Sequence, residues 1–358
     1  MRPSAASRRR AELLLLPAIN LAGALVLSAL VVLAAGADPF RAMAVLAMGA
    51  AGDPASLGYT LYYATNFIFT GLAVAIPFHA GLFNIGGEGQ AYIGGLLASL
   101  ACLLLGPSLG VAAVPLAIAG AALGGALWAS VPAWLRVTRG SHVVITTIMF
   151  NFIASGVMTF LLINVLIAPN QSAPETVAFP EATWMPGIGP MLGPSPINLS
   201  FPLALLLALA TWIFLWRTRW GFAIRASGAN AEAARAAGIS VGRSIVLAMT
   251  LGGALAGLVA VNELMGAQHR LLLDFSLGYG FMGIAVAMMG RNHPAGICLA
   301  ALFFGALYQG GTELSFDMPQ VTRDIVVVIE GLAILFCGAL ENLFRGRIAR
   351  WLGQEFET

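Results

Sequence analysis

The sequence predicts an all-α protein, a polytopic bundle of transmembrane helices. Hydrophobic residues make up 59% of the 358 residues and charged residues only 9%, and the mean hydropathy is +0.87. A soluble domain carries about a quarter charged residues to cover its surface. Because the few charges here lie between long apolar runs, those runs must face lipid or one another. We therefore expect a single transmembrane domain over residues 1–358.

The apolar runs indicate about ten spans. A helix needs about 20 residues to cross ~30 Å of hydrocarbon. The eighth run is short enough for a broken or tilted helix. The runs cover residues 12–36, 57–78, 87–105, 109–135, 142–167, 199–216, 244–261, 277–289, 295–312 and 325–340.

The arginine distribution predicts that both termini are cytoplasmic, because positively charged loops stay on that side. With the N-terminus inside, 15 of the 18 arginines fall in the cytoplasm, and only Arg41, Arg270 and Arg323 fall outside. Residues 1–11 and 342–358 are then cytoplasmic tails.

The longest external loop in this arrangement covers residues 168–198. It contains no arginine, two acids (Glu175 and Glu181) and seven prolines. Proline interrupts helices, so we expect no regular helix through this loop. A soluble partner could contact it from outside.

Two patterns concern packing. Gly120 with Gly124, and Gly253 with Gly257, have the small-xxx-small spacing that lets transmembrane helices approach closely. Residues 86–151 also weakly resemble residues 280–330, which suggests a two-fold internal repeat of the kind common in transporters. Biased composition produces such similarity by chance as well.

Polar residues inside a bilayer are costly, so each is a candidate for function. The densest cluster follows Pro77 and contains Asn84, Glu88 and Gln90 among four glycines. Irregular backbone at membrane depth occurs where it is buried in protein or lines a wet path, so these three side chains are candidates for the translocation pathway. The alternative is a cytoplasmic hairpin in which Asn84 caps the next helix and Glu88 lies in its first turn.

Glu330 is the fourth pathway candidate, because it lies in the middle of the last apolar run. It is expected either to pair with a basic or amide group or to line the pathway. The asparagines in the spans, Asn66, Asn151 and Asn164, are expected to hold helices together.

The cytoplasmic loop at residues 217–243 is predicted to contain a short helix. Asn230 is a good N-cap, Glu232 lies in the first turn, and Gly238 is a ready stop. A helix of about two turns does not persist alone in water, so it must dock on a partner or on its own membrane domain. Ala234 would let it seat closely, and Arg235 would be available to an acidic rim.

Two segments resemble a known family. Gly81-Leu-Phe-Asn-Ile-Gly-Gly-Glu-Gly-Gln90 and Arg225-Ala-Ser-Gly-Ala-Asn-Ala-Glu-Ala-Ala-Arg-Ala-Ala-Gly-Ile239 are similar to permease subunits of bacterial ABC importers of the branched-chain amino acid, ribose and nucleoside type, closest to the nucleoside and simple-sugar branch. The resemblance implies a multi-pass protein of the inner membrane that works beside a second permease subunit. It also implies a cytoplasmic ATP-binding subunit, an external solute-binding protein, and a coupling role for residues 217–243.

The chain contains no lysine, since all 18 basic residues are arginine. A Walker A loop needs a lysine on the phosphates, so ATP must be used by the partner subunit, and we expect no cofactor on this chain. The scattered histidines and cysteines predict neither an enzyme active site nor a metal site, and no nucleic-acid partner is expected. The alternative is a secondary transporter driven by an ion gradient, for which Glu88 and Glu330 are the available intramembrane carboxylates.

Overall fold

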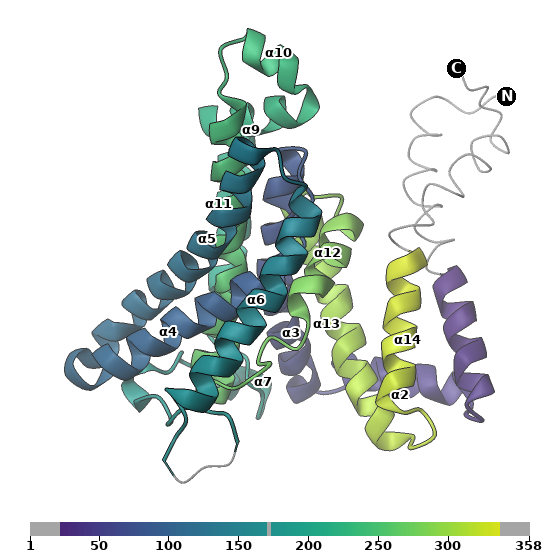
Figure 1. Cartoon of the computed structure of the whole chain (residues 1–358). Helices are drawn as coiled ribbons and strands as arrows, with labels where there is room; N and C mark the ends of the chain where they lie inside the picture. The colour runs from purple at the N-terminus through teal and green to yellow at the C-terminus, as the bar shows by residue number, and fades with distance from the viewer. Residues whose placement is uncertain (1–21, 170–172, 337–358) are drawn as a thin grey trace, which may run out of the picture. The chain divides into compact units, whose positions relative to one another are not determined.

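The computed structural model describes residues 22–169 and 173–336, and within them every regular element is a helix (Figure 1). The only β pairing among these residues is two isolated bridges, Glu175 with Leu272 and Gly187 with Asn198. The all-α prediction is thus confirmed for the described chain. The described residues divide into two compact units: those of Leu57–Gly305, and a smaller unit made of the described parts of Met1–Ser56 and Ala306–Thr358.

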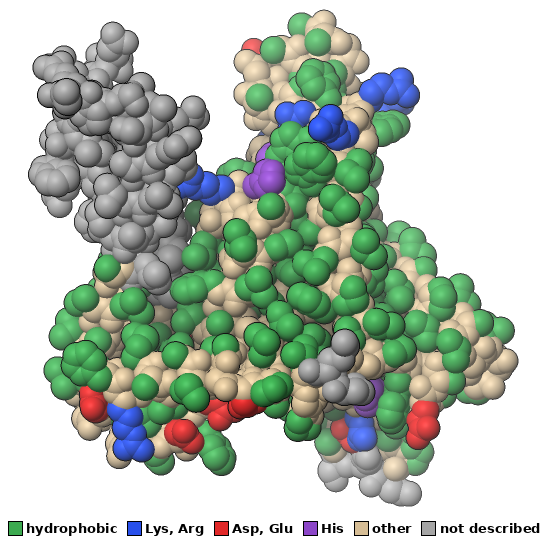
Figure 2. Space-filling view, turned by 180° about the vertical axis from the view of Figure 1, so that it is seen from behind, with side chains coloured by type: hydrophobic (Ala, Val, Ile, Leu, Met, Phe, Trp, Pro, Cys, Tyr) green, Lys and Arg blue, Asp and Glu red, His purple; other side chains and the backbone are tan. Residues whose placement is uncertain are grey.

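The larger unit is built around α3, whose side chains from Ala64 to Ala75 are almost all fully buried. Its middle surface is hydrophobic, and its charged side chains lie toward the two ends (Figure 2). Large apolar side chains such as Leu127, Phe152 and Leu206 are exposed there, as expected for a surface that contacts lipid. Its helices are α3 (Pro54–His79), α4 (Gly87–Leu109), η1 (Gly110–Ala112), α5 (Ala113–Arg139), α6 (Val143–Asn164), α8 (Ser200–Arg217), α9 (Arg219–Ala229), α10 (Ala231–Ala236), α11 (Val241–Gly257), the π-helix η3 (Val261–Gln268), α12 (Tyr279–Met289) and the first part of α13 (Pro294–Asp317).

Glycine sets the closest helix contacts, between α4, α5 and α11, which lie side by side in Figure 1. A Cβ atom at Gly257 would collide with the backbone carbonyl of Ala121 on α5. One at Gly124 would lie 2.5 Å from the carbonyl oxygen of Ile93 on α4. Both predicted small-xxx-small pairs therefore lie in helix–helix contacts. In lipid the hydrophobic effect does not drive helices together, so close packing of their backbones stabilises such contacts instead.

The prediction of ten spans is not confirmed. Among the residues that the structure describes, six helices are long and apolar enough to cross a membrane, or seven if the bent pair Ala22–Ala34 and Pro39–Ala51 (115°) is one span. The predicted third and fourth spans lie in one continuous helical run, Gly87–Arg139. Helix α12 has only 11 residues, and parts of the first and last predicted spans lie outside the described residues. The predicted membrane orientation and the internal repeat stay predictions.

The smaller unit contains the helix Ala22–Ala34, α2 (Pro39–Ala51), the end of α13 and α14 (Arg323–Ile334). Helix α2 was not predicted, although its start carries the expected signals: Asp38 accepts a hydrogen bond from Phe40 N (2.9 Å), and proline occupies the first helical position. The core of this unit is apolar and consists of Val32, Ala37, Ala42, Leu314, Met318, Val321, Val326 and Ile329.

The loop at residues 168–198 contains only a 3-10 turn, η2 (Glu181–Thr183), and the single turn α7 (Gly189–Leu192) in its described part. The expectation that its prolines exclude a long helix is confirmed there. The loop is docked through its backbone on the residues around the end of η3: Phe179 N donates to His269 O (2.7 Å), and Met185 N donates to Met265 O (2.8 Å).

Candidate functional site

The glycine-rich segment between α3 and α4 is irregular, as predicted. Helix α3 continues through Pro77 and ends at His79, and Gly81 turns the chain with φ +75°. Leu82 N returns to Pro77 O (3.0 Å). A positive φ is accessible to glycine without steric cost, which explains why the turn falls at this position.

Asn84 and Gln90 form a closed amide pair in this segment. Each donates its side-chain amide to the other's side-chain oxygen, at 3.1 Å in both directions. Asn84 Oδ1 also accepts a hydrogen bond from Gly86 N (3.0 Å). Both side chains are almost completely buried. Asn84 thus satisfies a backbone group immediately before α4, although the N-cap residue itself is Gly86.

Glu88 joins the start of α4 to the start of α12. Its carboxylate accepts hydrogen bonds from Ser276 Oγ (2.5 Å), Gly278 N (3.0 Å) and Gly280 N (2.9 Å). The two helix starts lie so close that a Cβ atom at Gly87 would be 3.2 Å from Gly280 Cα. Because the N-terminus of a helix favours negative charge, one buried carboxylate stabilises both helices here.

Helix α6 holds the same segment through Asn151. Its Oδ1 accepts a hydrogen bond from Gly89 N (2.9 Å), and its Nδ2 donates to Ile85 O (2.9 Å). The prediction that Asn151 holds helices together is confirmed. The result is a buried network across α4, α6 and α12, which we call the Glu88 network and define as Asn84, Glu88, Gln90, Asn151 and Ser276.

A second buried network surrounds the π-helix η3. Asn66 on α3 donates to Glu263 Oε1 (2.6 Å) and accepts from Asn262 Nδ2 (2.9 Å). Asn198 donates to Asn262 Oδ1 (2.9 Å). Glu263 is 1% exposed, and the side chain of Tyr279 also hydrogen-bonds to it. π-helical turns are rare and often lie at functional sites.

Sequence reasoning missed Glu263, because the predicted seventh span stopped at residue 261. In the structure the apolar helical run continues to Gln268 through η3, which places Asn262 and Glu263 inside it. A signal was present: an adjacent amide and carboxylate directly after a long apolar run, with no basic residue between them and the span. Asn66 was predicted only to hold helices together, and it does so by bonding α3 to η3.

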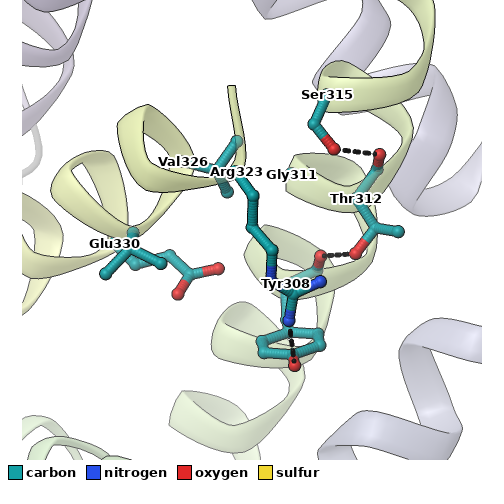
Figure 3. Close-up of a pocket in the computed structure, with 8 residues that line it drawn as sticks. Tyr308, Gly311, Thr312, Ser315, Arg323, Val326 and Glu330 are labelled. Atoms are coloured by element: carbon teal, nitrogen blue, oxygen red, sulfur yellow. Dashed lines mark hydrogen bonds between the residues drawn. The ribbon is translucent and has the colours of Figure 1, made fainter. Parts of the chain in front are cut away.

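Glu330 lies in the smaller unit, on α14, and is 9% exposed. It borders a cavity of about 20 Å³, room for one water molecule, between α13 and α14. Figure 3 shows its carboxylate directed toward the side chain of Arg323, which donates to Tyr308 OH (3.1 Å). The structure thus brings Asn84, Glu88 and Gln90 together, whereas the fourth predicted pathway residue belongs to the other unit.

The predicted short helix is confirmed as α10. Asn230 caps it, its Oδ1 accepting from the backbone N–H groups of Glu232 and Ala233, both at 3.0 Å. Gly238 ends it with φ +79°. Helices α9 and α10 project beyond the ends of α5 and α11 (Figure 1). Helix α9 itself was not predicted.

The two faces of α10 differ. Ala234 is only 4% exposed and faces its own chain, whereas Glu232, Ala233, Arg235, Ala236 and Ala237 are exposed. A groove of about 520 Å³ runs beside α10 and is lined by Arg136 and Arg235 among others. The outer face of α10 and this basic groove are therefore free to receive a partner with acidic groups.

Apolar spanning helices, two buried polar networks and a capped helix beyond the spans define the class of this protein: a polytopic membrane transport protein. Residues 56–337 match the family described as the permease component of the branched-chain amino acid transport system. The chain belongs to this family, as its resemblance predicted.

Three relatives extend the match to nearly the whole chain. The glucose ABC transporter permease protein TsgB13 of Haloferax volcanii is 34% identical, over 93% of this chain and 89% of its own length. The guanosine ABC transporter permease protein NupP of Bacillus subtilis is 34% identical, over 90% and 92%. The nucleoside ABC transporter permease protein NupB of Lactococcus lactis is 32% identical, over 90% of each. No solved structure matches the chain.

The family makes this chain a membrane-spanning permease subunit of an ABC transporter and not itself an enzyme. ATP hydrolysis in such a transporter belongs to separate subunits, in agreement with the missing lysine. Among the described residues, no group of histidine, cysteine or acidic side chains is placed to hold a metal ion.

Proposed function

We propose that this chain is the subunit through which an ABC importer moves a nucleoside, or a simple sugar, across the bacterial inner membrane. The observation that carries the proposal is its similarity, over nearly the whole chain, to both a guanosine permease and a glucose permease at the same 34% identity. Nucleosides and sugars share a hydroxylated ring, so a pathway with amide and carboxylate groups suits both.

We assign the contact with the ATP-binding subunit to the outer face of α10. Asn230 and Gly238 hold α10 in shape, and Arg235 lies beside the basic groove. A preformed helix at the end of the spans can pass movement to the membrane domain, because the end of α9, directly before α10, packs on the glycine-rich turn before α4. ATP is then bound and used only by the partner. A solute-binding protein contacts the loop at residues 168–198 from outside, and a second permease subunit, identical or paralogous, completes the assembly.

We place Asn84, Glu88 and Gln90 beside the translocation path. Two helices that start within the protein, with a carboxylate at the junction, create a polar site between helix ends. Both oxygens of Glu88 already accept hydrogen bonds, so its role in the proposal is to hold the junction in shape. Glu330 is kept as a proposed pathway residue of the smaller unit.

Reconstitution tests the proposal. The chain is placed in liposomes with its ATP-binding subunit and second permease, and the solute-binding protein is added with guanosine, adenosine, cytidine, ribose or glucose. We expect hydrolysis stimulated by the binding protein, and uptake of one solute class only. Uptake by this chain alone under an ion gradient would instead establish the secondary-transport alternative.

A further inference from the structure

A second hollow, of about 370 Å³, lies between α9 and the start of α11. Its lining contains two arginines, Arg219 and Arg243, and no acidic residue. Both arginines are exposed. The single ion pair within residues 22–169 and 173–336 joins Arg270 to Glu175, so no carboxylate in that part of the chain neutralises the hollow.

The hollow lies where spanning helices end. Helix α8 ends at Arg217, and α9 begins at Arg219, after Thr218 caps it by accepting from Gly221 N (3.1 Å). Arg243 lies in the first turn of α11, and Leu247 lines the hollow one turn farther along that helix. The α11 wall of the hollow is thus basic at the helix start and apolar one turn farther along the span. A bilayer changes in the same order, from polar headgroups to hydrocarbon.

Exposed aromatic side chains flank the basic residues. Trp220, which lines the hollow, is 61% exposed, and Phe222 is 59% exposed. Figure 2 shows basic and hydrophobic side chains gathered together where the α9–α10 segment joins the spans. Tryptophan is enriched at the interface between membrane and water, where its apolar ring and polar N–H are both solvated.

We propose that this hollow binds the headgroup phosphate of an anionic phospholipid, with Arg219 and Arg243 donating to the phosphate oxygens. Ser240, at the start of α11, makes no side-chain cap to that helix, so the first N–H groups of α11 and the Ser240 hydroxyl are available to the same anion. Trp220 and Leu247 then contact the glycerol and the first methylene groups. Basic residues beside the end of a transmembrane helix attract such lipids.

The aromatic and apolar walls favour a lipid over a soluble anion. A free phosphate would use the arginines and leave Trp220 and Leu247 without a role. The hollow is also distinct from the basic groove proposed to face the ATP-binding subunit, because no residue lines both. Arg219 and Arg243 line the hollow, whereas Arg136 and Arg235 line the groove.

Native mass spectrometry of the full-length chain in detergent tests the proposal. Phosphatidylglycerol is titrated against the wild type, the double variant Arg219→Gln/Arg243→Gln, and the control Arg139→Gln, an exposed arginine at the end of α5 outside the hollow. A basic residue near a membrane surface adds about fivefold to affinity for anionic lipid. We therefore expect the double variant to lose on the order of 30-fold in affinity for one bound lipid, and the control to retain it.

Further readouts complete the test. Equal binding of phosphatidylcholine by all three proteins, and equal melting temperatures in that lipid, support a site for the anionic headgroup and show that the variants fold. Equal loss in Arg139→Gln would overturn the proposal in favour of general surface charge. Binding of inorganic phosphate as tight as that of phosphatidylglycerol would overturn it in favour of a free-phosphate site.

Discussion

Gly81 and Gly228 touch through their backbones. A Cβ atom built at Gly81 would lie 3.4 Å from Gly228 Cα, and one at Gly228 would collide with the carbonyl oxygen of His79. The contact joins the two segments that resemble importer permeases: the glycine-rich turn before α4 and the end of α9, directly before α10. The segment that leads into α10 is thus packed on the turn before the Glu88 network through a contact that contains no flexible side chain.

Replacing Gly228 with alanine should break this contact. Overpacking a filled site costs about 1–3 kcal/mol of stability. Replacing a helical glycine with alanine normally stabilises the helix by only about 0.5–1 kcal/mol, so the clash should dominate. We expect a lower melting temperature and reduced coupling of ATP hydrolysis to uptake. Gly156→Ala on α6, where a Cβ atom meets nothing within 4 Å, is the matched control and should be neutral or stabilising. Equal melting temperatures for the two variants would contradict the contact.

Glu88→Ala should destabilise the protein by about 3 kcal/mol or more, because buried donors left without an acceptor each cost about 1–3 kcal/mol. Glu88→Gln should cost less stability, because the amide oxygen of glutamine can still accept hydrogen bonds. Its NH₂ group, however, would face a backbone N–H and could not accept from it. Thermal unfolding in detergent measures both, with the exposed Glu181→Gln as control. If Glu88→Gln keeps full stability and full transport, the carboxylate charge has no role in either.

Asn66→Leu should destabilise the network around η3. The change removes the donor to Glu263 and the acceptor for Asn262, so two fully buried groups lose a partner, at a cost of about 3 kcal/mol or more. Asn164→Leu provides the comparison, because Asn164 is exposed and bonds only to the carbonyl of Phe160 in its own helix. A loss of the same size in both variants would mean that the network around η3 does not set the cost.

Ala236→Arg should block the ATP-binding subunit without disturbing the fold. Ala236 is exposed on α10, whereas Ala234 faces its own chain and would report on local packing instead. Copurification of the ATP-binding subunit is the measurement, and Ala182→Arg, which makes the same change at an exposed alanine in the loop at residues 168–198, is the control. Wild-type copurification and transport by Ala236→Arg would remove the outer face of α10 from the interface.

Acid should loosen the docking of the loop at residues 168–198. His269 stacks on Trp184 with ring centroids 3.7 Å apart. Burial lowers the pKa of His269 below 6.5; its hydrogen bond to the carbonyl of Met265 opposes this shift, and the charge of Arg270 adds to it. The stability from the neutral ring is therefore fully present above pH 6.5 and is lost as the pH falls through the lowered pKa.

Melting temperatures between pH 8 and pH 5 check this dependence. The His269→Phe variant keeps an aromatic ring against Trp184 but cannot titrate, so it should lose less stability on acidification than the wild type. Parallel curves for the two proteins would assign the acid sensitivity to other groups.

Local signals in the sequence predicted local structure well. The cap at Asn230, the stop at Gly238 and the glycine spacing on α5 and α11 act over a few residues, and each is found where it was expected. The irregular backbone after Pro77 follows from glycine in the same way. These features depend on backbone geometry, which neighbouring residues determine.

Features that depend on distant contacts were not predictable. The partners of Glu88 lie about 190 residues away in the chain, so its carboxylate could be a cap, a pathway group or both. Glu263 fell outside a span whose length was judged from hydropathy, because a π-helical extension has no hydropathy signal. Helix α9 was missed because two arginines and two glycines interrupt its apolar residues, and its start directly follows the predicted end of the sixth span.

The bonds of Glu88 also limit how the protein can move. Separating α4 from α12 would leave a buried carboxylate and two backbone N–H groups without partners, so we expect the two helices to move as one rigid body during transport.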